Sequence, residues 1–261
     1  MSDIPEHVTR MNALSEAGRH DELLALLRKS FDEVEQAVAP ERTDLFFTMF
    51  RWSMLAEEFA PARKALEQAR EGQIARLLAG DLYVGRDRET STEEDWYLRI
   101  GCFSLIVQMN ETLADAGSTH RLFARLDAEQ PGLARRCAWQ ALPALVEEGD
   151  FMLADRYRGD PLQGMDEVNR GVTAFPLFPP PRTAPRLAGM LSNLVKEVGI
   201  GVAVLRGLGR EQEAVSLRAA LLDGLDAEHL REWAARELEE EGALRREVVA
   251  RQMAQEDQAP A

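Results

Sequence analysis

The sequence predicts an all-α protein, and its composition, its periodicity and the placement of its glycines carry that prediction. Of the 261 residues, 45% are hydrophobic, 29% are charged and only 7% are aromatic. Ala, Leu, Glu and Arg dominate, and these residues favour helices, whereas strands favour the β-branched and aromatic residues that are scarce here. Apolar residues recur at helical spacing, and glycines interrupt the pattern where helices are expected to end.

The N-terminal part is expected to begin with four helices. Pro5 favours a helix start, because its missing N–H costs nothing in a first turn, and Pro40 ends the second helix. The third helix is apolar on several sides through Phe46, Phe47 and Phe50, so we expect it to be central to a core. The four helices are predicted over residues 5–18, 20–40, 43–55 and 62–78.

The periodicity lapses between Asp81 and Asp95. Thr92 is a suitable N-cap for the next helix, with acidic residues at its positive end, and this helix is expected to run to Gly117. Residues 175–185 hold five prolines, cannot be helical, and are expected to adopt polyproline II geometry. The other helices are predicted over residues 119–129, 131–148, 150–157, 186–208, 210–224 and 226–252.

These elements predict a chain in four parts. The first, residues 1–174, is an array of helical hairpins, and residues 175–185 form a proline-rich connector. Residues 186–253 are a C-terminal helical part that packs on the array, and residues 254–261 are a disordered tail.

Several helix breaks share a local pattern. Gly18, Gly117, Gly149 and Gly209 are each expected to end a helix, and Leu or Ala follows five residues later. Glycine supplies the left-handed conformation of a turn between antiparallel helices, and a small residue one turn later lets the two backbones approach. The residues at the fifth position are Leu23, Leu122, Ala154 and Ala214, and Ala62 follows Glu57 at the same distance.

This pattern resembles the turn and second-helix half of tetratricopeptide repeats. The resemblance covers about half of the chain and implies an irregular stack of antiparallel helical hairpins. The aromatic signature of the first helix is missing, and the breaks at residues 18, 57, 117, 149 and 209 are unevenly spaced. The alternative is an irregular helical bundle with ordinary glycine caps.

Charge and composition limit the partners and the compartment. The formal net charge is −14, which repels phosphate backbones and anionic lipid, so we expect neither nucleic acid nor membrane as a partner. A basic protein is the natural complement, although the acidity can also serve solubility alone. The N-terminus has no signal-peptide pattern, and the longest apolar run (198–205) is too short to span a bilayer. Cys102 and Cys137 are expected to be free thiols. These features predict a cytoplasmic protein. Arginine-rich, alanine-rich usage indicates a bacterial source.

No motif of an enzyme or of a cofactor site stands out. The sequence has no Walker-type loop, HExxH, GxSxG or CxxC, and we expect no cofactor. Gly199 and Gly201 are expected to serve close helix packing. Asp226 and His229 have the spacing of a metal pair, but nothing completes a ligand set, so we expect no metal and interpret Asp226 as an N-cap.

The best candidate for a partner-binding surface is the segment 87–97, because its carboxylates adjoin aromatic residues that could anchor an interface. Its predicted contact residues are Asp87, Glu89, Glu93, Glu94, Asp95, Trp96 and Tyr97. The charged residues 226–261 are a second acidic surface, for which a solvated helix face is the simpler interpretation.

Together these features are loosely similar to acidic helical bacterial immunity proteins, which neutralise a toxin by occluding it. The resemblance implies a non-catalytic inhibitor that captures a basic effector electrostatically and then blocks it. One alternative is a scaffold or adaptor that binds a peptide or helix in a concave groove. Another is a helical enzyme that uses converging carboxylates with perturbed pKa values. The oligomeric state is not predicted.

Overall fold

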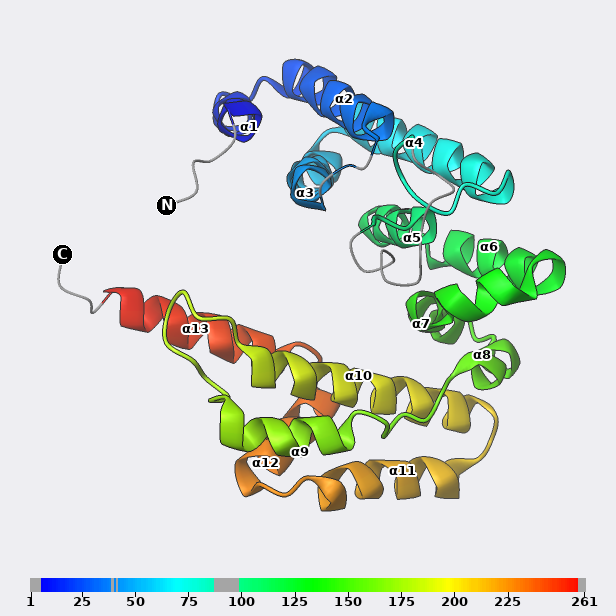
Figure 1. Ribbon diagram of the computed structural model, residues 1–261, viewed down its shortest axis with the longest axis vertical. Helices are drawn as coiled ribbons and strands as arrows, with labels where there is room; N and C mark the ends of the chain where they lie inside the picture. The colour runs from blue at the N-terminus through cyan, green and yellow to red at the C-terminus, as the bar shows by residue number, and fades with distance from the viewer. Residues whose placement is uncertain (1–5, 39, 41, 87–98, 258–261) are drawn as a thin grey trace. The chain divides into compact units, whose positions relative to one another are not determined.

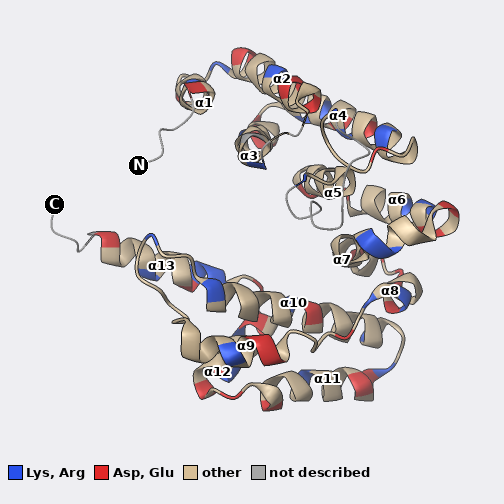
Figure 2. Ribbon diagram, in the orientation of Figure 1, with Lys and Arg blue, Asp and Glu red and all other residues tan. Residues whose placement is uncertain are grey.

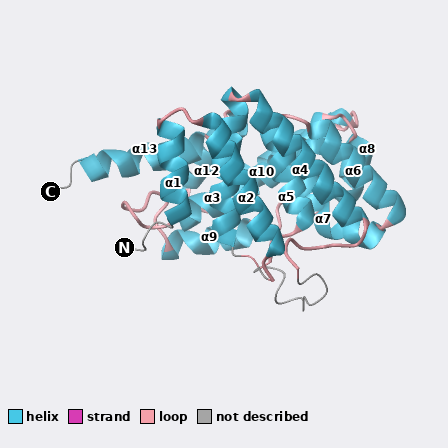
Figure 3. Cartoon of the chain, turned by 90° about the horizontal axis from the view of Figure 1, so that it is seen from above, coloured by secondary structure: helices cyan, strands magenta, loops and turns pink. Residues whose placement is uncertain are grey.

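The computed structural model describes residues 6–38, 40, 42–86 and 99–257. Within these residues the chain forms thirteen α-helices and no strand, which confirms the all-α prediction (Figures 1 and 3). The helices are α1 Glu6–Glu16, α2 His20–Gln36, α3 Arg42–Glu58, α4 Ala60–Leu78, α5 Cys102–Leu113, α6 Ala116–Glu129, α7 Pro131–Glu147, α8 Phe151–Tyr157, α9 Met165–Ala174, α10 Arg186–Gly207, α11 Glu211–Gly224, α12 Glu228–Glu239 and α13 Ala243–Asp257.

The chain divides into two compact units, Met1–Ala141 and Leu142–Ala261. The division therefore falls inside α7, whereas the sequence placed the end of the hairpin array at residue 174. In the first unit each helix from α1 to α5 packs against the next one, α5 packs against α6, and α3 also contacts α5. The odd-numbered helices form one layer and α2, α4 and α6 the other (Figure 1).

Glycine turns separate several helices as predicted. Gly18, Gly149 and Gly209 have φ angles of 65°, 75° and 74°, in the left-handed region that favours glycine. Gly117 does not end a helix, because the preceding helix already stops at Leu113 with Ala114 in the left-handed conformation. Asp115 then caps α6 by accepting a hydrogen bond from the Ser118 amide, so Gly117 lies inside the first turn of α6.

The helix predicted from Thr92 is described from Cys102 onward as α5, and Thr92 itself lies outside the described residues. Gly101 is its N-cap, and Tyr83 and Gly101 form an isolated antiparallel bridge. The Val84 amide donates to the Ile100 carbonyl and the Cys102 amide donates to the Leu82 carbonyl. This pairing requires extended backbone, so Ile100 and Gly101 are not part of the helix.

Helix α10 forms the core of the second unit. It contacts α8, α9, α11, α12 and α13, and it supplies more residues to the buried apolar cluster than any other helix. It is also the one helix of the described residues that is long and apolar enough to cross a membrane by length and composition. A helix surrounded by five others of its own unit has the environment of a core helix, which accounts for its apolarity.

The structure departs from the sequence prediction at four places after residue 160. Helix α9, which was not predicted, follows Gly164, and it is only ten residues long with little buried apolar surface. The single helix predicted over 226–252 is instead α12 and α13, separated by a turn in which Gly242 has a φ of 79°. The N-cap of α12 is Ala227, not Asp226, whose amide donates to the Asn169 side chain. Helix α13 continues to Asp257, into the predicted tail.

A buried polar network ties α4 to α5 and α6. The Arg70 guanidinium pairs with the Asp115 carboxylate at 2.6 Å and donates to Asn110, which in turn donates to Thr119. Partial burial opposes ionisation of Asp115. Hydrogen bonds from Ser118 and Arg70 outweigh that effect and hold the pKa of Asp115 below its ordinary value.

The Asp115→Asn variant is expected to lose stability relative to the native chain at neutral pH and to approach it in acid. Because the folded-state pKa is lowered, the stabilisation by Asp115 is present above the unfolded-state pKa, about 4, and is lost as the pH falls through the folded value. Urea unfolding followed by circular dichroism at several pH values measures this, with Asp223→Asn at an exposed position as the control. A difference between native and Asp115→Asn that stays constant with pH would contradict the assignment.

Candidate functional site

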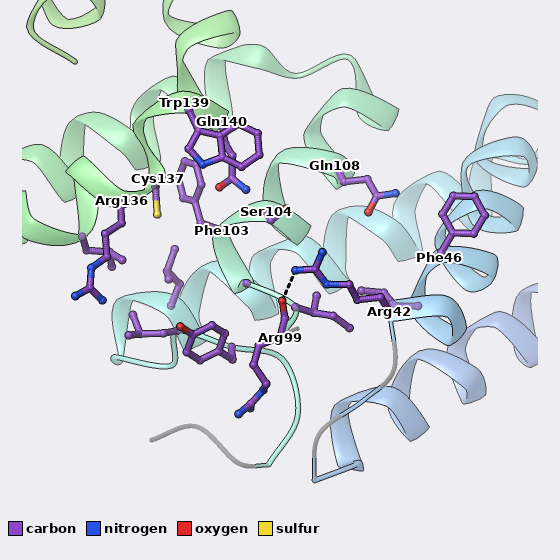
Figure 4. Close-up of a pocket in the computed structure, with 17 residues that line it drawn as sticks. Arg42, Phe46, Arg99, Phe103, Ser104, Gln108, Arg136, Cys137, Trp139 and Gln140 are labelled. Carbon is purple, nitrogen blue, oxygen red and sulfur yellow. Dashed lines mark hydrogen bonds between the residues drawn. The ribbon is translucent and has the colours of Figure 1, made fainter. Parts of the chain in front are cut away.

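The first unit contains a hollow of about 650 Å³ between α3, α5, α7 and the segment that follows α4 (Figure 4). This volume is typical of small-molecule sites. The residues that line it are Arg42, Leu45, Phe46, Leu77, Leu82, Tyr83, Arg99, Ile100, Gly101, Phe103, Ser104, Gln108, Leu133, Arg136, Cys137, Trp139 and Gln140.

The N-terminal ends of three helices meet at this hollow. Arg42 is the first residue of α3, Gly101 is the N-cap of α5, and Leu133 is the third residue of α7, and all three line it. The odd-numbered helices of an alternating array run in the same direction, so their N-termini come to one edge. Each N-terminus carries a partial positive charge, and the hollow therefore favours a negatively charged group.

Arginine side chains add to this positive character. The Arg42 guanidinium donates to the Arg99 carbonyl at 2.8 Å (Figure 4). The Arg99 guanidinium lies over the Tyr83 ring, 5.0 Å from its centroid. Within the described part of the chain, neither Arg42 nor Arg136 pairs with a carboxylate. No Asp or Glu among those residues lines the hollow. The charged side chains that line the hollow, among the residues the structure describes, are thus all cationic.

The walls combine aromatic rings with neutral hydrogen-bonding groups. Trp139 is 60% exposed although it is one of the largest apolar side chains, and Phe46 and Phe103 contribute further rings. Gln108 and Gln140 present amides (Figure 4). Cys137 is different, because burial raises the pKa of its thiol to about 12, so it stays protonated at neutral pH and is a poor nucleophile.

A row of exposed apolar side chains continues from this hollow along α3. Phe46, Phe50 and Met54 are four residues apart and are 57%, 48% and 45% exposed. The Phe46 and Phe50 rings stack at 6.1 Å. The expectation that α3 is central to a core holds only for its other face, where Met49 and Trp52 are buried. We call Phe46, Phe50 and Met54 the α3 row.

The second unit has a hollow of similar volume, about 640 Å³, beside α10 and the turn between α12 and α13. Its one buried carboxylate, Glu237, is fully engaged: it accepts hydrogen bonds from the Gly242 and Leu244 amides and from the Ser192 hydroxyl. Glu237 therefore stabilises the turn and the start of α13, and it does not supply a free base to this hollow.

The structure does not test the binding residues predicted from the sequence. Asp87, Glu89, Glu93, Glu94, Asp95, Trp96 and Tyr97 all lie outside the described residues. Among the residues that are described, no group of three or more His, Cys, Asp or Glu side chains could hold a metal ion.

We call the hollow of the first unit, which Arg42, Arg99 and Arg136 line, the arginine hollow. Sequence reasoning missed it, since its walls come from segments almost one hundred residues apart. The one local signal is on α7, where Arg136, Trp139 and Gln140 share a face at helical spacing.

Compared with protein-family models, with curated proteins and with solved structures, the chain matches none.

Proposed function

We propose that the chain is a non-catalytic binding protein that captures a basic protein partner and blocks it, as an immunity-type inhibitor of a bacterial effector toxin would. The observation that carries this proposal is the α3 row, because adjacent large apolar side chains exposed to solvent mark protein interaction sites. Aromatic side chains are also the ones that most often anchor an interface.

Charge supplies the second part of the proposal. The net charge is −14, and Asp and Glu lie on helices of both units (Figure 2). Such a field accelerates encounter with a basic partner, whereas desolvated apolar contacts slow its dissociation. The carboxylates of the segment 87–95 remain the sequence-based candidates for the first contact.

An adaptor that binds a peptide or a helix is the second candidate. The position of the α3 row favours it, because Phe46 belongs both to the row and to the lining of the arginine hollow. A helix-sized ligand that lies along α3 could contact both. This candidate predicts weaker affinity and little dependence on salt.

The first step of the test is to capture binding proteins from a bacterial lysate with the tagged protein and to elute them with increasing salt. The affinity of the recovered partner is then measured with both proteins in purified form. Phe50→Ala is expected to lower the affinity for that partner at least about tenfold, as for an anchor residue. Val215→Ala, at an exposed position on α11, should leave the affinity unchanged. Charge reversal in the segment 87–95 should slow association at low salt.

Equal affinity of the Phe50→Ala and Val215→Ala variants would remove the α3 row from the interface. A single basic partner that is released by salt supports the inhibitor. Affinity that does not change with salt supports the adaptor instead.

A further inference from the structure

The arginine hollow has features that a protein interface alone does not explain. It is a concave site of about 650 Å³ with aromatic walls, and Arg42 and Arg136 line it without a carboxylate partner among the described residues. A chain with 45 acidic residues offers many possible partners for these two cations. That no described carboxylate pairs with either arginine is consistent with a site whose negative charge comes from a ligand.

We propose that this hollow binds a small organic anion, a molecule with one carboxylate or phosphate and a flat apolar body. Arg136, near the N-terminal end of α7, would hold the anionic group, and Trp139 on the same helix would contact the apolar body (Figure 4). The proposal does not rest on the protein partner proposed above, although Phe46 belongs to both surfaces, and binding of the small anion can be measured on the isolated chain.

The volume of the hollow and its mixture of apolar and polar lining residues favour this class of ligand. Drug-sized ligands occupy sites of about 300–1,000 Å³ lined by apolar side chains with a few polar groups. A free inorganic anion would leave the aromatic walls in water. A neutral apolar molecule would make no charge-assisted contact with Arg136.

Two naphthalene probes separate the contribution of charge from that of apolar contact. The anionic probe is 1-anilinonaphthalene-8-sulfonate, whose sulfonate represents the ligand's anionic group, and N-phenyl-1-naphthylamine is its neutral counterpart. We expect the anionic probe to bind saturably in a 1:1 ratio, measured by fluorescence titration, and to raise the melting temperature. The absence of saturable binding would overturn the proposal.

Arg136→Gln is the decisive variant, because Arg42 also holds the Arg99 carbonyl and its replacement could disturb the fold. Loss of one charge-assisted contact is expected to lower the affinity for the anionic probe about tenfold and the affinity for the neutral probe less than twofold. Arg135→Gln changes the net charge equally on the same helix but outside the lining residues, and it should leave both probes unchanged. Equal effects of Arg135→Gln and Arg136→Gln would overturn the assignment.

Competition identifies the anionic group. Displacement of the anionic probe by 1-naphthoate supports a carboxylate ligand, and displacement by 1-naphthyl phosphate supports a phosphate. Displacement by both supports the shared chemistry. Displacement by neither compound would overturn the proposal.

Discussion

Replacing Glu237 by alanine is expected to lower the free energy of unfolding by about 3 kcal/mol. Glu237 is 7% exposed, and its two carboxylate oxygens accept hydrogen bonds from the amides of Gly242 and Leu244 and from the Ser192 hydroxyl. Alanine would remove three hydrogen bonds to a charged group and leave buried amides without an acceptor. This change is strongly destabilising because the donors stay in the protein and lose their acceptor.

Glu239→Ala is the matched control on the same helix. Glu239 pairs with Arg218 at 3.0 Å, but its side chain is 71% exposed, and exposed ion pairs contribute less than about 1 kcal/mol. Urea unfolding of both variants, followed by circular dichroism, gives the comparison. Similar losses in the two variants would show that Glu237 acts only through its general charge, and would contradict its role at the α12–α13 turn.

This turn also shows why the sequence prediction was wrong there. Residues 226–252 contain helix formers and several possible i, i+4 ion pairs, so local propensity favours one continuous helix. One such pair, Glu247 with Arg251, does form at 2.6 Å. The break at Gly242 instead depends on Glu237 reaching the first amides of α13 and on Leu244 entering the core, which are tertiary contacts that no local pattern reports.

The helical class was predictable because amphipathic periodicity reflects burial directly. Val8, Met11 and Leu14 at helical spacing are all buried, as the pattern predicts. The same logic failed for α3, since an all-round apolar pattern indicates a core helix but does not distinguish a buried face from an exposed binding face. Phe46 and Phe50 therefore appeared as core residues in the sequence and are exposed in the structure.

The candidate site was less predictable than the fold. Arg42 and Arg136 are 94 positions apart, and each resembles any other surface arginine in the sequence. Their joint role depends on the alternating direction of successive helices, which brings the N-terminal ends of α3 and α7 to one edge. That arrangement follows from how the helices of the first unit pack, so only the fold could reveal it.

The second large effect concerns the glycines of α10. Replacing glycine by alanine is expected to change the free energy of unfolding in opposite directions at two of these positions. The sequence predicts close packing at both Gly199 and Gly201. In the structure an added Cβ would meet Leu217 and Pro161 at 2.9 Å at Gly201, but nothing within 4 Å at Gly199. At Gly207, the last residue of α10, it would lie 2.2 Å from the Phe151 ring.

Gly207→Ala is therefore expected to destabilise the chain by about 2 kcal/mol, because the ring is met close to its attachment and must move with the start of α8. Gly199→Ala is expected to stabilise the chain by roughly 0.8 kcal/mol, since alanine favours an open helical position over glycine. Thermal and urea unfolding measure both changes. Adding Phe151→Leu to Gly207→Ala should recover part of the loss, and no recovery would mean that the clash with the ring is not its cause.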